Sequence, residues 1–184
     1  TPHRWTLDEY RELDKLDAFR DVRTMLLDGE IFDMPPPGPN HDLCLGLTQD
    51  WLQAAIPGHH VRVQMAFHVG TGTDPSPDLV VVAGTRRDWT GRTPATAGLV
   101  VEVADSSLAV DTTRKAERYA TCLVPEYWVI DLVNRQLLVF RDPNPLHEGL
   151  GATAYRSHVT LNPDDTVAPL MAPAAAVRVA DLLP

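Results

Sequence analysis

Three ionisable side chains stand where the surrounding sequence predicts a buried environment. Asp78 begins the apolar run 79–82, Glu102 lies inside the run 99–103, and Lys115 lies in the helical stretch that follows. A continuous run of Leu and Val is typical of a strand that is covered on both faces. A charge on such a strand is costly to bury unless it is paired or binds a metal. Glu102, which has valines on both sides, is therefore the residue most in need of a chemical role.

The chemistry that these residue types can perform together is phosphodiester hydrolysis. Two carboxylates at matching ends of neighbouring strands can bind a hard divalent cation through oxygen ligands. A nearby ammonium group can stabilise the charge that develops on the phosphate, or help to deprotonate or orient the attacking water. Such a reaction needs no organic cofactor. Asp78, Glu102 and Lys115 therefore indicate a metal-dependent phosphodiesterase site.

Each of the three residues also has a purely structural interpretation. Asp78 follows Pro77 and, taken alone, is an ordinary residue at the start of a strand. Glu102 could lie in a buried ion pair or at a strand edge. Lys115 could lay its stem along a boundary with its ammonium in water, and Asp111, four residues earlier, could contact that ammonium. The three residues together favour catalysis more strongly than any one of them alone.

The elements that must position these residues are a mixture of helices and strands. Apolar residues at helical spacing predict helices near 6–16, 40–56 and 108–123. Asp28-Gly29 predicts a hairpin-like turn or the end of a helix that runs into a strand. Apolar patterns predict strands near 60–69, 79–82, 99–103, 126–132, 136–142 and 154–159. We therefore expect an α/β or α+β fold with helices packed on a mixed sheet.

Length and composition limit the class of protein. The 184 residues fit one domain, 1–184, and an apolar content of 44% is that of a folded protein with a substantial core. We expect no membrane span, because no apolar run reaches about twenty residues. The absence of a signal segment and the two cysteines in apolar patterns favour a cytoplasmic location.

The charge balance gives a mixed signal about nucleic acid. A net charge of -9 counts against binding long nucleic acid by electrostatics alone. Six basic residues nevertheless lie near the two acidic strands in sequence: Arg86, Arg87, Arg92, Arg114, Lys115 and Arg118. They could form a binding surface or simply a solvated one.

The sequence resembles the Uma-two family, restriction-endonuclease-like proteins within the PD-(D/E)XK nuclease superfamily. The likeness runs from about residue 20 to the C-terminus and is carried by Asp28-Gly29-Glu30, His41, the runs 77–82 and 99–103, Asp111, Lys115, Tyr119 and the segment 124–131. The resemblance implies a restriction-endonuclease-like mixed central sheet flanked by helices, here with extra antiparallel strands. It also implies that Asp78, Glu102 and the Val103 carbonyl bind Mg²⁺ or Mn²⁺.

The chain departs from the superfamily motif at one important position. The usual lysine stands two residues after the acid, where this chain has Ala104, and Lys115 in the following helix is the matching position. Glu30 resembles an extra acid that could bind a second metal or a metal-bound water, or it is an exposed acid after a turn. His41 could contact a phosphate or transfer a proton, or it could cap or pack the start of a helix.

Three functions are therefore open. The first is a Mg²⁺- or Mn²⁺-dependent DNA endonuclease, expected to act as a homodimer because cutting both strands commonly needs paired sites. The second is a catalytically inactive nuclease-fold module that binds nucleic acid or protein. The third is a structural dimerisation protein that uses the strands near 126–132 and 136–142. The presence of all three site residues favours the first, whereas the acidic net charge favours the second.

Overall fold

The computed structural model describes residues 1–70, 72–145 and 153–184. The helical elements are α1 (Leu7–Lys15), α2 (Pro39–Ala55), the 3-10 helix η1 (Arg86–Trp89), α3 (Leu108–Val110), the π-helical turn η2 (Asp111–Lys115), α4 (Ala116–Thr121) and the 3-10 helix η3 (Val179–Leu182). The strands are β1 (Arg23–Leu27), β2 (Glu30–Met34), β3 (His59–Val63), β4 (Leu79–Ala83), β5 (Leu99–Ala104), β6 (Glu126–Asp131), β7 (Gln136–Pro145), β8 (Thr153–Leu161), β9 (Thr166–Val167) and β10 (Val177–Arg178). No helix among these described residues is long and apolar enough to cross a membrane.

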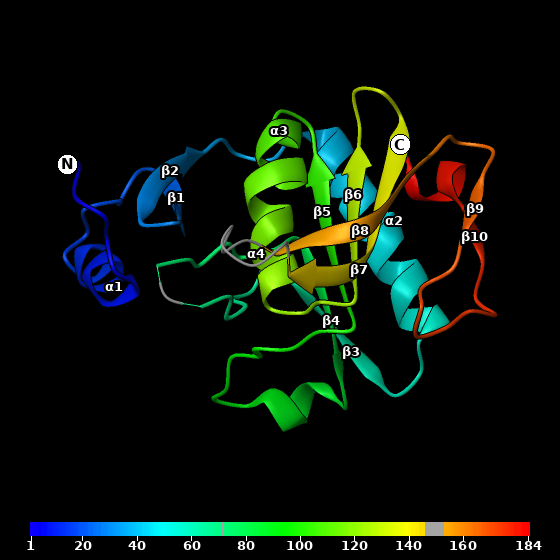
Figure 1. Ribbon diagram of the computed structural model, residues 1–184, viewed down its shortest axis with the longest axis horizontal. Helices are drawn as coiled ribbons and strands as arrows, with labels where there is room; N and C mark the ends of the chain where they lie inside the picture. The colour runs from blue at the N-terminus through cyan, green and yellow to red at the C-terminus, as the bar shows by residue number, and fades with distance from the viewer. Residues whose placement is uncertain (71, 146–152) are drawn as a thin grey trace.

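A six-stranded mixed sheet lies at the centre, in the order β3-β4-β5-β6-β7-β8. Its neighbouring strands are antiparallel except for β5 and β6, which run parallel. A parallel pair needs a crossover, and α3, η2 and α4 provide it across one face of the sheet (Figure 1). The expected mixed sheet with flanking helices and extra antiparallel strands is confirmed.

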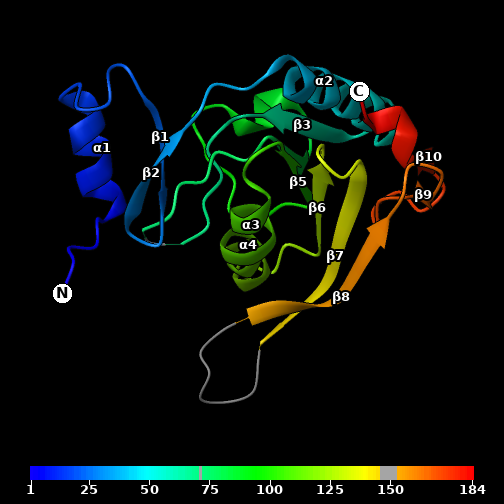
Figure 2. The same ribbon diagram turned by 90° about the horizontal axis from the view of Figure 1, so that it is seen from above.

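Helices and loops cover both faces of the sheet (Figure 2). On one face Val81 and Val101 pack against α2 and the C-terminal segment that contains η3. On the other face Val80 and Val100 pack with Tyr119 of α4. Because successive residues of a strand point to opposite faces, a strand covered on both sides must be apolar throughout. This burial explains the continuous apolar runs of β4 and β5.

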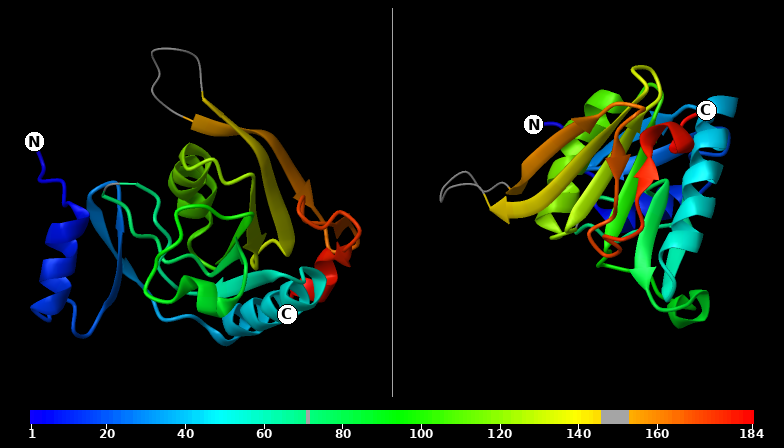
Figure 3. Two further views of the ribbon diagram at one scale, coloured as in Figure 1. Left: turned by 90° about the horizontal axis from the view of Figure 1, so that it is seen from below. Right: turned by 90° about the vertical axis from the view of Figure 1, so that its right-hand side faces the viewer.

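The last two strands extend the sheet past its centre and lean over α4 (Figure 3). Tyr155 of β8 donates a hydrogen bond to the Val124 carbonyl, just beyond α4, at 2.9 Å. At the start of β6, Glu126 is fully buried and accepts hydrogen bonds from Arg141 and Trp128. These contacts hold the β7–β8 hairpin against the body of the protein.

An N-terminal arm, made of α1 and the β1–β2 hairpin, stands to one side of the sheet (Figure 1). The hairpin turns at Asp28 and Gly29, which have φ angles of 55° and 75°, and the turn expected there is confirmed. Backbone hydrogen bonds join the arm to the body, from Gly29 to the Gly72 carbonyl at 2.9 Å and from Asp74 to the Leu26 carbonyl at 2.8 Å.

Two expected elements differ in detail. The strand expected over 60–69 ends at Val63, because Gln64 takes a φ of 46°, which ordinary strand residues do not adopt. Phe67 and Val69 still reach the core without strand structure, which explains why the alternating pattern continues. The helix expected over 108–123 forms, but η2 widens its middle turn.

Candidate active site

Gln64, Asp78 and Glu102 lie in one row across three neighbouring strands. The pairings of β4 with β3 and with β5 are both antiparallel, and both include Leu79, the first residue of β4. Asp78 comes just before Leu79, so it lies opposite Gln64, which follows β3, and opposite Glu102 in β5. The Gln64 amide confirms this register, because it donates to the Asp78 carbonyl at 3.0 Å. The start of β4 thus meets the end of β5, and the two carboxylates come together as the sequence analysis expected.

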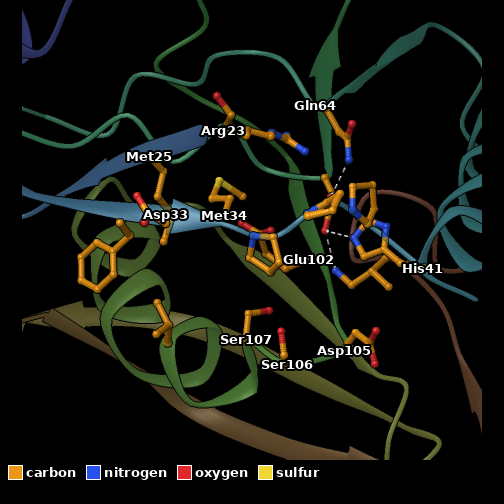
Figure 4. A pocket seen from close by; sticks show the side chains of 18 of the residues that line it. Arg23, Met25, Asp33, Met34, His41, Gln64, Glu102, Asp105, Ser106 and Ser107 are labelled. Carbon is orange, nitrogen blue, oxygen red and sulfur yellow. Dashed lines mark hydrogen bonds and ion pairs between the residues drawn. The ribbon is translucent and has the colours of Figure 1, made fainter. Parts of the chain in front are cut away.

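Asp78 is held by three hydrogen-bond donors. Its Oδ2 accepts from the Val103 amide at 2.8 Å and pairs with His41 Nε2 at 3.2 Å, and its Oδ1 accepts from Gln64 Nε2 at 3.2 Å (Figure 4, dashed lines). Burial raises the pKa of the Asp78 carboxyl, but the His41 contact, followed by the Val103 and Gln64 hydrogen bonds, outweighs burial and lowers it. The same contact with Asp78 raises the pKa of His41. Asp78 is therefore held as a carboxylate.

Glu102 and Lys115 form a buried ion pair between β5 and η2. Lys115 Nζ lies 3.1 Å from Glu102 Oε1 and 2.8 Å from Asp111 Oδ1. Tyr119 donates its hydroxyl to Glu102 Oε1 at 2.7 Å. None of these four residues is more than 4% exposed. Burial lowers the pKa of Lys115, but the nearby charges of Glu102 and Asp111 outweigh burial and raise it, so the ammonium form is favoured.

The pKa of the Glu102 carboxyl group is shifted in the opposite direction from that of Asp78. Burial raises its pKa to about 8; Lys115 opposes this effect, whereas the charges of Asp111 and Asp78 add to it. Within the described ranges, no hydrogen bond is directed at Glu102 Oε2, although Glu102 lines a pocket. Glu102 therefore has an oxygen available for a further partner.

The π-helical turn η2 presents Lys115 to the sheet. Thr112 and Thr113 donate their hydroxyls to the carbonyls of Leu108 and Ala109, four residues earlier, a contact that bends helices. Asp111 and Lys115, at the two ends of the turn, are both buried. Wide turns of this kind occur frequently at functional sites. The helix thereby brings a lysine to Glu102, although the chain has Ala104 at the usual position.

The site residues line a pocket of about 330 Å³. Its lining includes His41, Asp78, Glu102, Val103 and Lys115, the five expected site residues that the fold brings together. Figure 4 shows Glu102 deep between two walls, with Met25 and Met34 on one side and Ser106 and Ser107 on the other. These five residues come from α2, from the position just before β4, from β5 and from η2, so the pocket forms only in the folded chain.

Glu30 is the expected site residue that the structure does not bring to the others. It does not line the pocket. Its carboxylate pairs with Arg4 and, at 2.7 Å, with Arg114, which also contacts Asp28. Arg114 and Arg118 are therefore not simply solvated, because both pair with Asp28 in the β1–β2 turn. The geometry agrees with an acid after a turn rather than with a second metal ligand.

Some of the basic residues that lie near the acidic strands in sequence are far from the pocket in the folded chain. Arg86, Arg87 and Arg92 follow the far end of β4, whereas Asp78 precedes its start, so these three lie away from the pocket.

Gln64 is a site residue that the sequence did not reveal. Its only sequence signal is a polar side chain in a strand-like pattern, and its role depends on the register with Asp78.

The sheet and its flanking helices place the protein in the restriction-endonuclease-like class of folds. The chain matches the model of the Uma2 family over residues 7–180. This is the Uma-two family named above, and its description is "Putative restriction endonuclease". It belongs to this family. A crystal structure described as a "putative nuclease belonging to DUF820", from Anabaena variabilis, has a TM-score of 0.68 and 16% sequence identity, and the match covers 96% of each chain. At that identity the likeness concerns the fold alone. No curated protein matches this chain.

Proposed function

We propose that this protein is a Mg²⁺- or Mn²⁺-dependent DNA endonuclease. The observation that supports this most is the convergence of Asp78, Glu102 and Lys115, from three separate segments of the chain, in one pocket. Each of these residues is less than 10% exposed, and such burial of charge is costly without a role or a partner. Membership of the Uma2 family supports the same class of reaction.

The donor set of the pocket fits a hard divalent cation. Asp78, Glu102 and the Val103 carbonyl would provide oxygen ligands, and Glu102 Oε2 has no hydrogen bond from the described residues. In the described part of the chain, no group of three His, Cys, Asp or Glu side chains has metal-binding geometry. Mg²⁺ commonly takes only one or two carboxylates and completes its shell with water and substrate oxygens. When bound, the ion would supply Lewis-acid polarisation of the phosphoryl group.

The remaining side chains have distinct parts in this proposal. Lys115 is flanked by two carboxylates, which favour its ammonium form, so it would donate hydrogen bonds to the phosphate and stabilise its developing charge rather than act as a base. His41 and Gln64 contact Asp78 and would orient its carboxylate, as groups around metal ligands commonly do.

The direct test is cleavage of plasmid and single-stranded DNA by the purified protein with Mg²⁺ or Mn²⁺. We expect metal-dependent cleavage that falls by about a hundredfold or more in Glu102→Gln and Lys115→Met, since both remove charge from the reacting centre. Lys15→Met is the matched control, because Lys15 is an exposed lysine on α1 that pairs with Glu12. Activity that survives in both site variants would identify a contaminant and contradict the proposal.

A protein that cleaves none of these substrates would next be titrated with Mn²⁺ by calorimetry. Failure of the wild type to bind Mn²⁺, together with no cleavage, would favour the catalytically inactive module instead. The homodimer and the single domain expected from the sequence stay predictions. Light scattering and limited proteolysis of the intact chain test them.

A further inference from the structure

The proposed reacting groups lie on the floor of a recess rather than on an open surface. Asp78 is 8%, Glu102 3% and Lys115 4% exposed, and all three line the pocket of about 330 Å³. This volume is near the lower end of the range for pockets that bury one small ligand. A phosphodiester can reach these groups only if the part of the nucleotide chain around it enters the recess.

The recess has walls on opposite sides (Figure 4). The wall on the side of the β1–β2 hairpin is mainly apolar, with Met25, Phe32 and Met34, and the segment Pro35–Pro37 continues it. The opposite wall is the loop after β5, which contains Ser106 and Ser107. The two walls approach each other at one end, where a Cβ built on Gly38 would lie 3.8 Å from Asp105 Oδ2.

The hairpin wall is fastened to the helix that carries Lys115. Arg114 contacts Asp28 Oδ2 at 3.1 Å, Glu30 Oε2 at 2.7 Å and the Leu27 carbonyl at 3.1 Å. Its guanidinium also lies over the Phe32 ring, 5.0 Å from the centroid. Together with the backbone hydrogen bonds of the arm, these contacts make the wall part of the folded body.

The charges around the recess do not match a long polyanion. Arg23 is an exposed base that lines the pocket, but the exposed acids Asp33 and Asp105 line it too. A net charge of -9 adds no general attraction. Proteins that track a duplex neutralise many phosphates with Lys and Arg. This recess offers contacts to few phosphates.

We infer that the substrate is single-stranded DNA, or an unpaired segment within a duplex; the inference rests on the proposed nuclease function. In a duplex each nucleotide is stacked and paired, and enzymes that act inside a narrow pocket must first extrude it. An unpaired nucleotide enters the recess without that cost. Its base can lie against the apolar wall at Met34 and Phe32, while its phosphate reaches Lys115 and the carboxylates.

The test compares three labelled DNA substrates of one sequence: a single strand, its blunt duplex, and the duplex with a central unpaired bulge. Each is incubated with Mn²⁺ and either the wild type or Glu102→Gln. We expect the single strand and the bulged duplex to be cleaved at least about tenfold faster than the blunt duplex, which must first unpair. Cleavage should depend on Glu102 in every case.

The outcomes separate this inference from the function on which it rests. Glu102-dependent cleavage that is equally fast on the blunt duplex would overturn the inference and leave the nuclease in place. Absence of Glu102-dependent cleavage on every substrate would overturn the nuclease, and the inference with it. We also expect kcat/KM to fall less than about tenfold between 50 and 200 mM salt, whereas six or more phosphate contacts would cause a loss of about a thousandfold. A loss of that size would contradict the inference.

A substitution in the apolar wall tests directly whether this wall contacts the base of the substrate. Met34→Ala should raise KM for the single strand about fivefold or more with little change in kcat, because apolar surface against which the base packs is lost. Leu170→Ala is the control, since Leu170 is 50% exposed and does not line the pocket. An unchanged KM in Met34→Ala would show that the apolar wall does not contact substrate.

Discussion

Lys115 Nζ lies 3.1 Å from Glu102 Oε1, and this buried ion pair joins the crossover helix to strand β5. Asp111 lies on the other side of the same ammonium, at 2.8 Å. Two carboxyl groups therefore share one lysine, and all three residues are buried. The arrangement makes Lys115 important for stability as well as for the proposed chemistry.

Removing the Lys115 charge should destabilise the protein. Lys115→Met leaves the buried carboxyl groups of Glu102 and Asp111 without their counter-ion. Above the Glu102 pKa of about 8, where Glu102 is ionised, breaking a buried pair in this way costs about 3–5 kcal/mol. Urea denaturation measures the loss, and Lys15→Met should change stability by less than about 0.5 kcal/mol, as exposed substitutions usually do. Equal stability of Lys115→Met and the wild type would show that the ion pair is absent in solution.

Tyr119 should affect the affinity for Mn²⁺ through its hydrogen bond to Glu102. Tyr119→Phe removes the hydroxyl that donates to Glu102 Oε1, and we expect Mn²⁺ affinity to change by about tenfold, as is typical for partners of metal ligands. Tyr155→Phe is the matched control, because its hydroxyl binds the Val124 carbonyl outside the pocket. Both variants should lose about 1 kcal/mol of stability. Equal Mn²⁺ affinities in the two variants would contradict this role.

Gln64 should orient Asp78 without being essential to the fold. In Gln64→Ala, Asp78 keeps its contacts with the Val103 amide and His41, so we expect cleavage to slow by about tenfold while stability falls by about 1 kcal/mol or less. Gln53→Ala, an exposed glutamine on α2, is the control. Cleavage kinetics and thermal melting measure the two effects. Full activity in Gln64→Ala would show that Gln64 is not needed to orient Asp78.

The affinity for Mn²⁺ should depend on pH through Glu102. A metal binds the carboxylate form, and burial raises the Glu102 pKa to about 8, so protons compete with the metal below that pH. Apparent affinity should therefore rise from pH 6 to pH 8, by up to about tenfold per unit, and level off above. Calorimetry in two buffers of different ionisation enthalpy detects the released proton. A constant affinity from pH 6 to pH 8 would contradict the proposed ligand.

Several features of the fold could be predicted from the sequence because their signals are local. The Asp28-Gly29 turn, the long helix α2 and the apolar runs of β4 and β5 depend on residues close together in the chain. The candidate residues Asp78, Glu102 and Lys115 could also be found, because a charge inside or beside a buried apolar pattern is unusual.

Other features depended on contacts between distant segments. The row that joins Gln64 to Asp78 follows from the β3–β4 register, and the pairing of Arg114 with Glu30 joins residues 84 positions apart. Sequence proximity placed Arg86 near the site, but the length of β4 carries it to the opposite end.

The sequence by itself therefore determined that the apolar runs of β4 and β5 had to be buried, and that Asp78 and Glu102 carried charge beside and within them. The tertiary structure decided which charges met: it assigned Lys115 to Glu102, Glu30 to Arg114, and Gln64 to Asp78. The physical reason is that burial depends on the local apolar pattern, whereas a charge finds its partner only when strand register and helix packing bring separate segments together.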